Sequence, residues 1–253
     1  MNGPYAVVLR FRAGQPVLPA VPEAIHAAFL GLVRRADPAL FAILHAPNHR
    51  VRPYTLAVLG PRGGLELRLR LSVLCPDLFL RFWERWEQRG GIPLRLGRAW
   101  LAPAEIQTKG PWAGETPWTK FAELPPAQRV ALAFATPTTF RQGDVDIPLP
   151  VPRLLFSGLL AKWNAASPNP LDLDPENIAR FVAVKEARVR TQPIWDGRAR
   201  IWGFVGCVEF RLKRDSPQAL RQGLAILSAF SFYAGVGRRT THGMGLVRLL
   251  HAA

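Results

Sequence analysis

The sequence predicts a mixed α+β fold in which the order strand, helix, strand, strand, helix, strand occurs twice. Three observations support this prediction: extended segments that alternate with period two, segments with apolar residues at helical spacing, and a stretch rich in proline and glycine between two halves. The chain has 253 residues, of which 49% are hydrophobic and 20% are charged. This composition excludes intrinsic disorder as the main state.

The first half begins with a strand over 5–12, in which apolar residues alternate with Arg10 and Arg12. A helix starts near Pro22, because proline is tolerated in the first helical turn. A second, short helix follows and ends near His45. The alternation in the strand predicts that only one of its faces is buried.

A hairpin is predicted next, with strands over 54–59 and 65–73 joined by a turn over 60–64 that is rich in glycine. Pro76 then opens a helix with large aromatic residues at helical spacing, and one extended segment follows over 94–106. This order of elements is that of the ferredoxin-like split βαβ unit.

The segment 109–126 carries several prolines and glycines without sustained periodicity, so we predict a linker between domains at 1–108 and 127–253. The second domain repeats the first in outline, with a long helix that starts at Pro217 and is capped by Asp215 or Ser216. Its other predicted elements are strands over 130–136, 181–190, 201–213 and 246–250 and a helix over 153–163. We therefore predict two tandem ferredoxin-like domains.

The charge of the chain points to a polyanionic partner. The 33 basic and 18 acidic residues give a formal net charge of +15, well above the magnitude of about 2 to 8 that keeps a small domain soluble. Nucleic acid is the first candidate partner. Arginine far outnumbers lysine, which favours phosphate binding through the planar guanidinium, although an arginine-rich genome explains this bias equally well.

Several classes of protein and site are disfavoured. Cys75 and Cys207 are the only cysteines, too few for a disulfide scaffold, so we expect a reducing, cytoplasmic location. The first residues lack the pattern of a secretion signal and no apolar stretch has the length of a membrane span, so we expect no membrane association. Asp144 and Asp146 could chelate a cation, but such an acidic pair in a loop is usually only solvated. We expect neither a metal nor a cofactor.

The most specific segment is a glycine-rich loop over 235–245, before the last strand. Glycines permit positive φ and close approach of the backbone, and the residues between them add hydrogen-bond donors. The predicted RNA-binding residues of this loop are Gly235, Gly237, Arg238, Arg239, Thr240, Thr241, His242, Gly243 and Gly245. The loop is neither a Walker A motif nor a dinucleotide fingerprint. A glycine-rich turn is often only a turn, but the interposed arginines favour phosphate binding.

These features together resemble a known family. The loop over 235–245, Leu44–His45 followed by Pro53–Thr55, and Thr136–Phe140 followed by Pro148–Pro150 are similar to motifs of the CRISPR-associated endoribonucleases that cut precursor CRISPR RNA, within the RAMP superfamily. The resemblance implies CRISPR repeat RNA as the partner. It leaves open whether the chain forms a homodimer or associates with subunits of a CRISPR effector complex.

The resemblance also implies metal-independent cleavage, in which the ribose 2′-oxygen attacks the adjacent phosphate. The products are a 2′,3′-cyclic phosphate and a 5′-hydroxyl. Histidine, with an ordinary pKa near 6.5, suits the base and the acid of this reaction. By its match to the family, His45 is the expected general base and His26 the expected acid or orienting group. Arg50 and Arg52 stand where some members have a lysine, and we expect them to contact RNA.

Other interpretations remain open for these residues. His26 could be a packed helix residue, His45 could serve only as a favourable positive charge at a helix end, and His49 is close enough to His45 to exchange roles with it. His242 could contact either RNA or solvent. Two alternative functions are a non-catalytic RNA-binding subunit of an effector complex and a generic RNA-binding protein of ferredoxin-like fold, although the aromatic signature of the latter is absent.

Overall fold

The structure is a computed structural model that describes residues 2–17, 21–46, 51–60, 64–195, 197 and 199–253. It divides into two units. The first unit comprises Met1–Thr116, Trp195–Arg198 and Thr241–Gly243, and the second comprises Pro117–Ile194, Ala199–Thr240 and Met244–Ala253. A short part of the glycine-rich loop is thus grouped with the N-terminal residues. The predicted domain boundaries, 1–108 and 127–253, stay a prediction.

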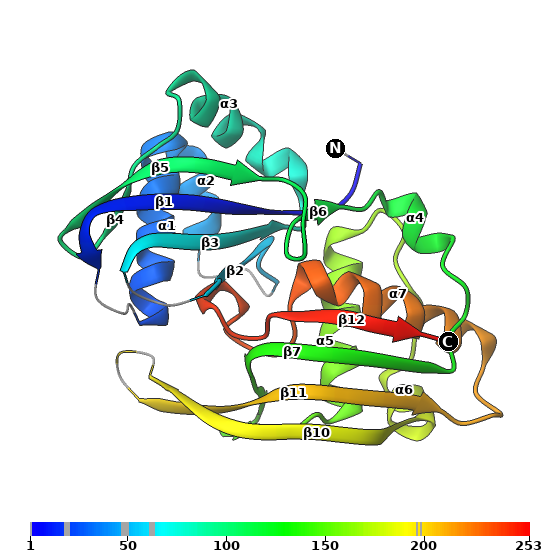
Figure 1. Ribbon diagram of the computed structural model, residues 1–253. Helices are drawn as coiled ribbons and strands as arrows, with labels where there is room; N and C mark the ends of the chain where they lie inside the picture. The colour runs from blue at the N-terminus through cyan, green and yellow to red at the C-terminus, as the bar shows by residue number, and fades with distance from the viewer. Residues whose placement is uncertain (1, 18–20, 47–50, 61–63, 196, 198) are drawn as a thin grey trace. The chain divides into compact units, whose positions relative to one another are not determined.

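The first unit is built on an antiparallel sheet with the strand order β2-β3-β1-β5-β4, and a short strand, β6, pairs with β1 (Figure 1). The strands are β1 (Tyr5–Val17), β2 (Tyr54–Val58), β3 (Gly64–Val73), β4 (Leu94–Leu96), β5 (Ala99–Gln107) and β6 (Gly114–Glu115). The order of β2, β3, β1 and β5 is that of a ferredoxin-like sheet. Leu9 and Phe11 on one face of β1 are completely buried, as predicted, but Ala6 and Val8 on the other face are buried too. The prediction of a single buried face is therefore wrong for the first part of the strand.

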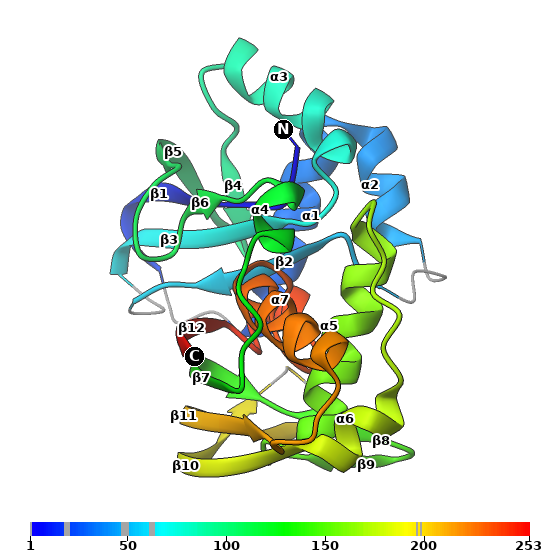
Figure 2. The same ribbon diagram turned by 90° about the vertical axis from the view of Figure 1, so that its right-hand side faces the viewer.

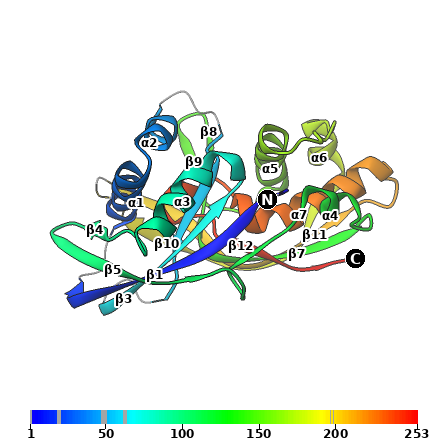
Figure 3. The ribbon, with the colours of Figure 1, turned by 90° about the horizontal axis from the view of Figure 1, so that it is seen from above.

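Three helices lie on one face of this sheet, as the view from above shows (Figure 3). They are α1 (Pro22–Ala36), α2 (Pro38–His45) and α3 (Leu80–Gln88), the last preceded by a 3₁₀ turn, η1 (Pro76–Phe79). Asp37 separates α1 from α2 and caps α2, because its Oδ1 accepts hydrogen bonds from the backbone N–H groups of Ala39 and Leu40 at 3.0 and 3.1 Å. This cap fixes where α2 starts. The helix ends at His45.

Two details of the first half differ from the prediction. The extended segment expected over 94–106 is a hairpin of β4 and β5, because Gly97, with φ 61°, reverses the chain between them. Leu65, the first apolar residue of the alternation in β3, is 57% exposed. The predicted turn between β2 and β3 includes residues 61–63, which lie outside the described part of the chain.

The second unit repeats the topology with the strand order β10-β11-β7-β12 (Figure 2). Its strands are β7 (Arg129–Thr138), β10 (Val182–Trp195), β11 (Arg200–Leu212) and β12 (Val247–Ala252), with a separate hairpin of β8 (Phe140–Gln142) and β9 (Val145–Ile147). Helices α5 (Pro152–Ala166) and α7 (Gln218–Ala234) lie on one face of the four-stranded sheet (Figure 3). The prediction of an α+β fold with two tandem ferredoxin-like halves is confirmed.

Three sequence-based boundaries in the second half need correction. The segment 109–126, expected to lack regular structure, contains β6 and a helix, α4 (Trp118–Ala122), which is too short to show periodicity but buries Phe121. Phe181 ends a helix, α6 (Pro175–Phe181), and does not start a strand. Pro217, and neither predicted residue, is the N-cap of α7. Ser216 instead accepts a hydrogen bond from Nε of Arg221 at 3.1 Å.

A helix that spans a membrane must be both long and apolar. Within the described ranges, no helix combines the length and the apolar composition needed to cross a bilayer.

Candidate functional site

The glycine-rich loop begins at a fixed point, the C-terminal end of α7. Gly235 ends the helix with φ 60°, and its N–H donates to the carbonyl oxygen of Ser231 at 2.9 Å. Lys162 of α5 donates from Nζ to the carbonyl oxygens of Ala234 and Gly235, at 2.9 and 3.0 Å. A cation at this end of a helix complements the helix dipole, but burial lowers the pKa of Lys162 to about 8.

The loop is then held against the C-terminal end of β7 by backbone hydrogen bonds. The N–H of Arg238 donates to the carbonyl oxygen of Thr139, and the N–H of Gly245 donates to that of Pro137, each at 3.0 Å. Gly237 and Gly245 have φ values of 78° and 70°, and a Cβ atom on either would collide with a carbonyl oxygen, of Thr139 or Val236 respectively. The glycines are therefore required by the backbone path of the loop itself.

Two glycine substitutions test this conclusion. Gly243 also has a positive φ, 86°, but a Cβ there would meet nothing within 4 Å. We expect Gly243→Ala to cost only the left-handed backbone strain, about 1 to 2 kcal/mol, and Gly237→Ala to cost distinctly more, because the loop must also move away from β7. Urea unfolding of both variants measures the difference, and equal losses would contradict the close approach.

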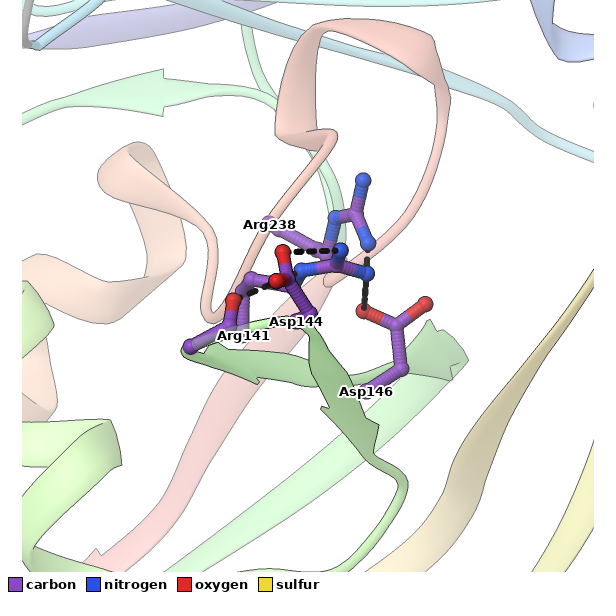
Figure 4. Close-up of polar contacts among 5 residues, drawn as sticks. Arg141, Asp144, Asp146 and Arg238 are labelled. Carbon is purple, nitrogen blue, oxygen red and sulfur yellow. Dashed lines mark hydrogen bonds and ion pairs between the residues drawn. The ribbon is translucent and has the colours of Figure 1, made fainter.

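Arg238 is held by an ion pair with Asp146 of the β8–β9 hairpin (Figure 4). Arg141 of the same hairpin contacts Asp146 at 3.3 Å and Asp144 at 3.4 Å. Sequence reasoning treated Arg238 as a phosphate ligand and could not see this carboxylate, which lies 92 positions away. The two aspartates are thus partners of arginines. Among the described residues, no group of three or more histidine, cysteine or acidic side chains is placed to hold a metal ion.

The Arg238 ion pair leads to a prediction about stability. Its side chains are only 29% and 25% exposed, so we expect Arg238→Gln to lower the free energy of unfolding by about 1 kcal/mol, or the melting temperature by about 2 to 4 °C. The matched control is Arg188→Gln, which removes an arginine that is 83% exposed and bonded to Glu186. We expect no measurable change there. A melting temperature for Arg238→Gln equal to the control's would show that the pair contributes nothing.

Arg239 has an unusual backbone conformation. Its φ of 57° is the one positive value at a residue other than glycine within the described ranges, and its carbonyl oxygen accepts a hydrogen bond from the N–H of Met244 at 3.3 Å. Left-handed backbone at such a residue costs about 1 to 2 kcal/mol, and glycine would avoid the cost. An arginine retained at a strained position favours a role for its side chain.

Residues Thr241 and His242 of the loop contact His26 of α1. Nδ1 of His26 lies 3.1 Å from the carbonyl oxygen of Thr241, and the ring of His242 stacks on that of His26 with centroids 4.0 Å apart and planes 20° apart. Thr241 Oγ1 lies 3.0 Å from Nδ1 of His242. Tyr54 of β2 is nearly parallel to the His26 ring at 6.4 Å. His26 and Thr241–Gly243 all belong to the first unit.

The surroundings of His26 define its protonation. Burial lowers the pKa of His26 below its ordinary value of 6.5; the hydrogen bond to Thr241 opposes this shift, and the charges of Arg52 and His45 add to it. A carbonyl oxygen only accepts hydrogen bonds, so Nδ1 of His26 must carry the proton. At neutral pH the ring is therefore uncharged, with its lone pair on Nε2. An imidazole in this state can accept a proton.

His45, the last residue of α2, is exposed and stacks on Phe41 at 5.2 Å. Arg52 secures this end of the helix, since its Nη1 donates to the carbonyl oxygens of Leu44 and Ala46 at 2.7 and 2.9 Å. The guanidinium predicted to contact RNA is thus also a cap on the helix that carries His45. Arg50 and His49 lie outside the described residues.

The site therefore combines residues that sequence reasoning had proposed for separate tasks. The charges of Arg52 and His45 both act on His26 and lower its pKa, and the expected roles of the three residues stay predictions. Thr241 and His242 contact His26, and their expected contact with RNA stays a prediction. No periodicity or spacing signal could have shown this contact, because 215 positions separate His26 from Thr241. Tyr54, which the resemblance used only as a marker of the strand start, also belongs to the surroundings of His26.

Comparison with known proteins places this geometry in context. The family model described as CRISPR-associated endoribonuclease Cas6 matches residues 132–247. The CRISPR-associated endoribonuclease Cas6 of Mycobacterium tuberculosis is 30% identical over 142 residues, which cover 53% of this chain and 44% of the relative. The chain thus spans less than half the length of that curated relative.

Solved structures are similar over nearly the full length. A Cas6 product complex aligns with a TM-score of 0.85 and 33% identity, covering 99% of this chain and 100% of the other. Thermus thermophilus Cas6 aligns with a TM-score of 0.79 and 32% identity, covering 99% of each chain.

Proposed function

The chain belongs to the Cas6 family of CRISPR-associated endoribonucleases, and on that premise we propose that it cleaves CRISPR repeat RNA within precursor transcripts. The observation that carries the proposal is the state of His26: a partly buried imidazole whose Nδ1 donates to a carbonyl oxygen and whose Nε2 is left with a lone pair. A general base for RNA cleavage must be a neutral imidazole with an available lone pair, and His26 meets this condition. This favours the nuclease over a non-catalytic subunit.

The proposed reaction is an internal transfer of the phosphate. The 2′-oxygen of the ribose loses its proton to a base and bonds to phosphorus, while the bond from phosphorus to the 5′-oxygen of the next nucleotide breaks. The departing oxygen takes a proton from an acid, which leaves a 2′,3′-cyclic phosphate and a 5′-hydroxyl. Both proton transfers are within the reach of imidazoles near neutral pH.

The geometry favours one division of roles between the two histidines. Nε2 of His26 is an unprotonated nitrogen at neutral pH, because burial disfavours the charged ring and Nδ1 holds the proton. We therefore assign the role of general base to His26. The role of general acid then falls to His45, a second imidazole whose charge acts on His26. This reverses the roles expected from sequence, which gave the base to His45.

The phosphate requires positive charge and hydrogen-bond donors. Arg52 contributes a guanidinium whose field already acts on His26. Arg239 of the glycine-rich loop is also proposed to contact RNA, and its strained backbone favours a role for its side chain. Arg238 reaches phosphate only by sharing or leaving Asp146. The other residues proposed to contact RNA are Gly235, Gly237, Thr240, Gly243, Gly245 and Arg50.

The direct test is to incubate the purified protein with the repeat RNA of its own locus in excess chelator and to map both ends of the products. The proposal requires cleavage at one position, a 2′,3′-cyclic phosphate on the upstream fragment and a 5′-hydroxyl on the downstream one. A 5′-phosphate, or cleavage that needs added metal, would contradict the mechanism. Binding without cleavage would favour the non-catalytic RNA-binding subunit. Homodimerisation, association with effector subunits and a cytoplasmic location stay predictions.

A further inference from the structure

The glycine-rich loop contacts His26 at two places, the ring edge and the ring face. The carbonyl oxygen of Thr241 accepts a hydrogen bond from the proton-bearing Nδ1 at 3.1 Å, and the ring of His242 covers one face at a centroid distance of 4.0 Å. Neither contact is suited to RNA. A carbonyl oxygen cannot donate to a phosphate, and a face already covered by a ring at stacking distance has no room for a base.

From these contacts we infer that Thr241 and His242 are positioning residues, which hold His26 in one tautomer and one ring orientation and are not ligands of the RNA. The inference rests on the proposed nuclease function for its catalytic consequence. His242 is itself oriented, because Thr241 Oγ1 lies 3.0 Å from its Nδ1. Thr241 thus contacts both rings of the stacked pair: its carbonyl oxygen contacts His26 and its hydroxyl contacts His242.

The inference has an electrostatic consequence, because the His242 ring keeps water from one face of His26. Arg52 and His45 lower the pKa of His26 through their charges, and His242 is stacked on its ring. The other titratable groups near His26 are Glu23, one turn earlier on α1, and the phenol of Tyr54. Burial raises the pKa of Tyr54, so the phenol stays neutral. Removing the His242 ring admits water, which raises the pKa of His26.

Two variants separate positioning from RNA binding. His242→Ala removes the ring, whereas His242→Phe keeps a flat aromatic ring without its nitrogens. For His242→Ala we expect the pKa of His26, followed by NMR titration of its ring protons, to rise toward 6.5. The single-turnover rate should rise with pH through the pKa of His26, and in His242→Ala we expect this acid limb of the pH profile to move to higher pH by the same amount as the pKa. At a pH below the acid limb, the cleavage rate should fall about tenfold for each pH unit of that shift. RNA affinity should stay within about twofold, since a ring stacked on His26 adds little to binding dominated by phosphate contacts. His242→Phe should restore both the pKa and the rate.

The outcomes that overturn the inference are equally specific. Weaker RNA binding by both variants, with the pKa of His26 unchanged, would make His242 an RNA ligand. An unchanged pKa and an unchanged rate in His242→Ala would make it a bystander. If His242→Ala fails to fold, His242→Phe still tests whether His242 binds RNA: lost affinity with a normal His26 pKa rejects the inference, and normal affinity supports the claim that His242 is no RNA ligand. Because the NMR titration needs no cleavage, a wild-type protein that leaves RNA intact would refute the proposed function and still leave the positioning claim measurable.

Discussion

A repeat RNA with 2′-deoxyribose at the cleaved nucleotide should bind with normal affinity and remain uncut. The proposed reaction uses the 2′-oxygen as its nucleophile, so replacing that hydroxyl with hydrogen removes the reacting atom itself. Binding should hardly change, because phosphate contacts dominate affinity in a chain of net charge +15. The expected result is the complete absence of product under single-turnover conditions, with a dissociation constant like that of the all-ribose RNA.

The control for this experiment is the same RNA with deoxyribose at either neighbouring nucleotide, which should be cut at close to the normal rate. Excess chelator should alter neither substrate's behaviour, since the reaction as proposed assigns both proton transfers to histidines. Cleavage of the deoxy substrate at the same bond would reject internal attack and require an external nucleophile such as water.

The second large effect is expected for His26→Ala. Removing a general base typically costs about 10² to 10⁴ in rate, so single-turnover cleavage should fall by at least about 10²-fold, while RNA affinity should barely move because the ring is uncharged at neutral pH. His45→Ala should lose about as much, through the acid. His251 of β12 is an exposed histidine, and His251→Ala is the matched control that should cleave normally.

The pH dependence of the wild-type rate checks the same assignment. The base must be neutral, so the rate should rise with pH through the pKa of His26. Because burial keeps that pKa below 6.5, the acid limb should lie below pH 6.5 and be missing in His26→Ala. Full activity in His26→Ala would return the base to His45, whereas full activity in His45→Ala would require another acid.

The fold was largely accessible from the sequence because its signals are local. Alternation over 5–12 predicted a strand and helical spacing after Pro22 predicted a helix, and both elements were confirmed. The alternation did not show that Ala6 and Val8, on the second face of the strand, are buried as well. The errors in the predicted elements occur where a single residue or a very short element departs from the periodicity of the surrounding segment. Gly97, with its positive φ, divides one predicted strand into a hairpin, and α4 spans five residues, too few to show a period.

The site was accessible only in part, because its contacts join distant segments. Resemblance to a family indicated His26 and His45, but no sequence pattern placed His242 on His26 or gave Arg238 a carboxylate partner. Side chains of the same type have different surroundings in the structure: Arg238 pairs with Asp146, and Arg52 caps a helix. The arginine-rich composition predicts phosphate binding. Only the structure shows that carboxylate and carbonyl oxygens of the protein itself already bind some of these guanidinium groups.

The long separation between His26 and its hydrogen-bond acceptor has a consequence for biosynthesis. The 215 positions between His26 and Thr241 correspond to roughly 10 to 40 s of translation at about 5 to 20 residues per second. Throughout that interval a nascent chain would carry the imidazole without the carbonyl group that sets its tautomer. In ribosome-bound chains stalled before α7, Nδ1 of His26 should therefore lack the acceptor that fixes its tautomer. The orientation of the proposed base would thus be set only when the last part of the chain, the glycine-rich segment, had been synthesised.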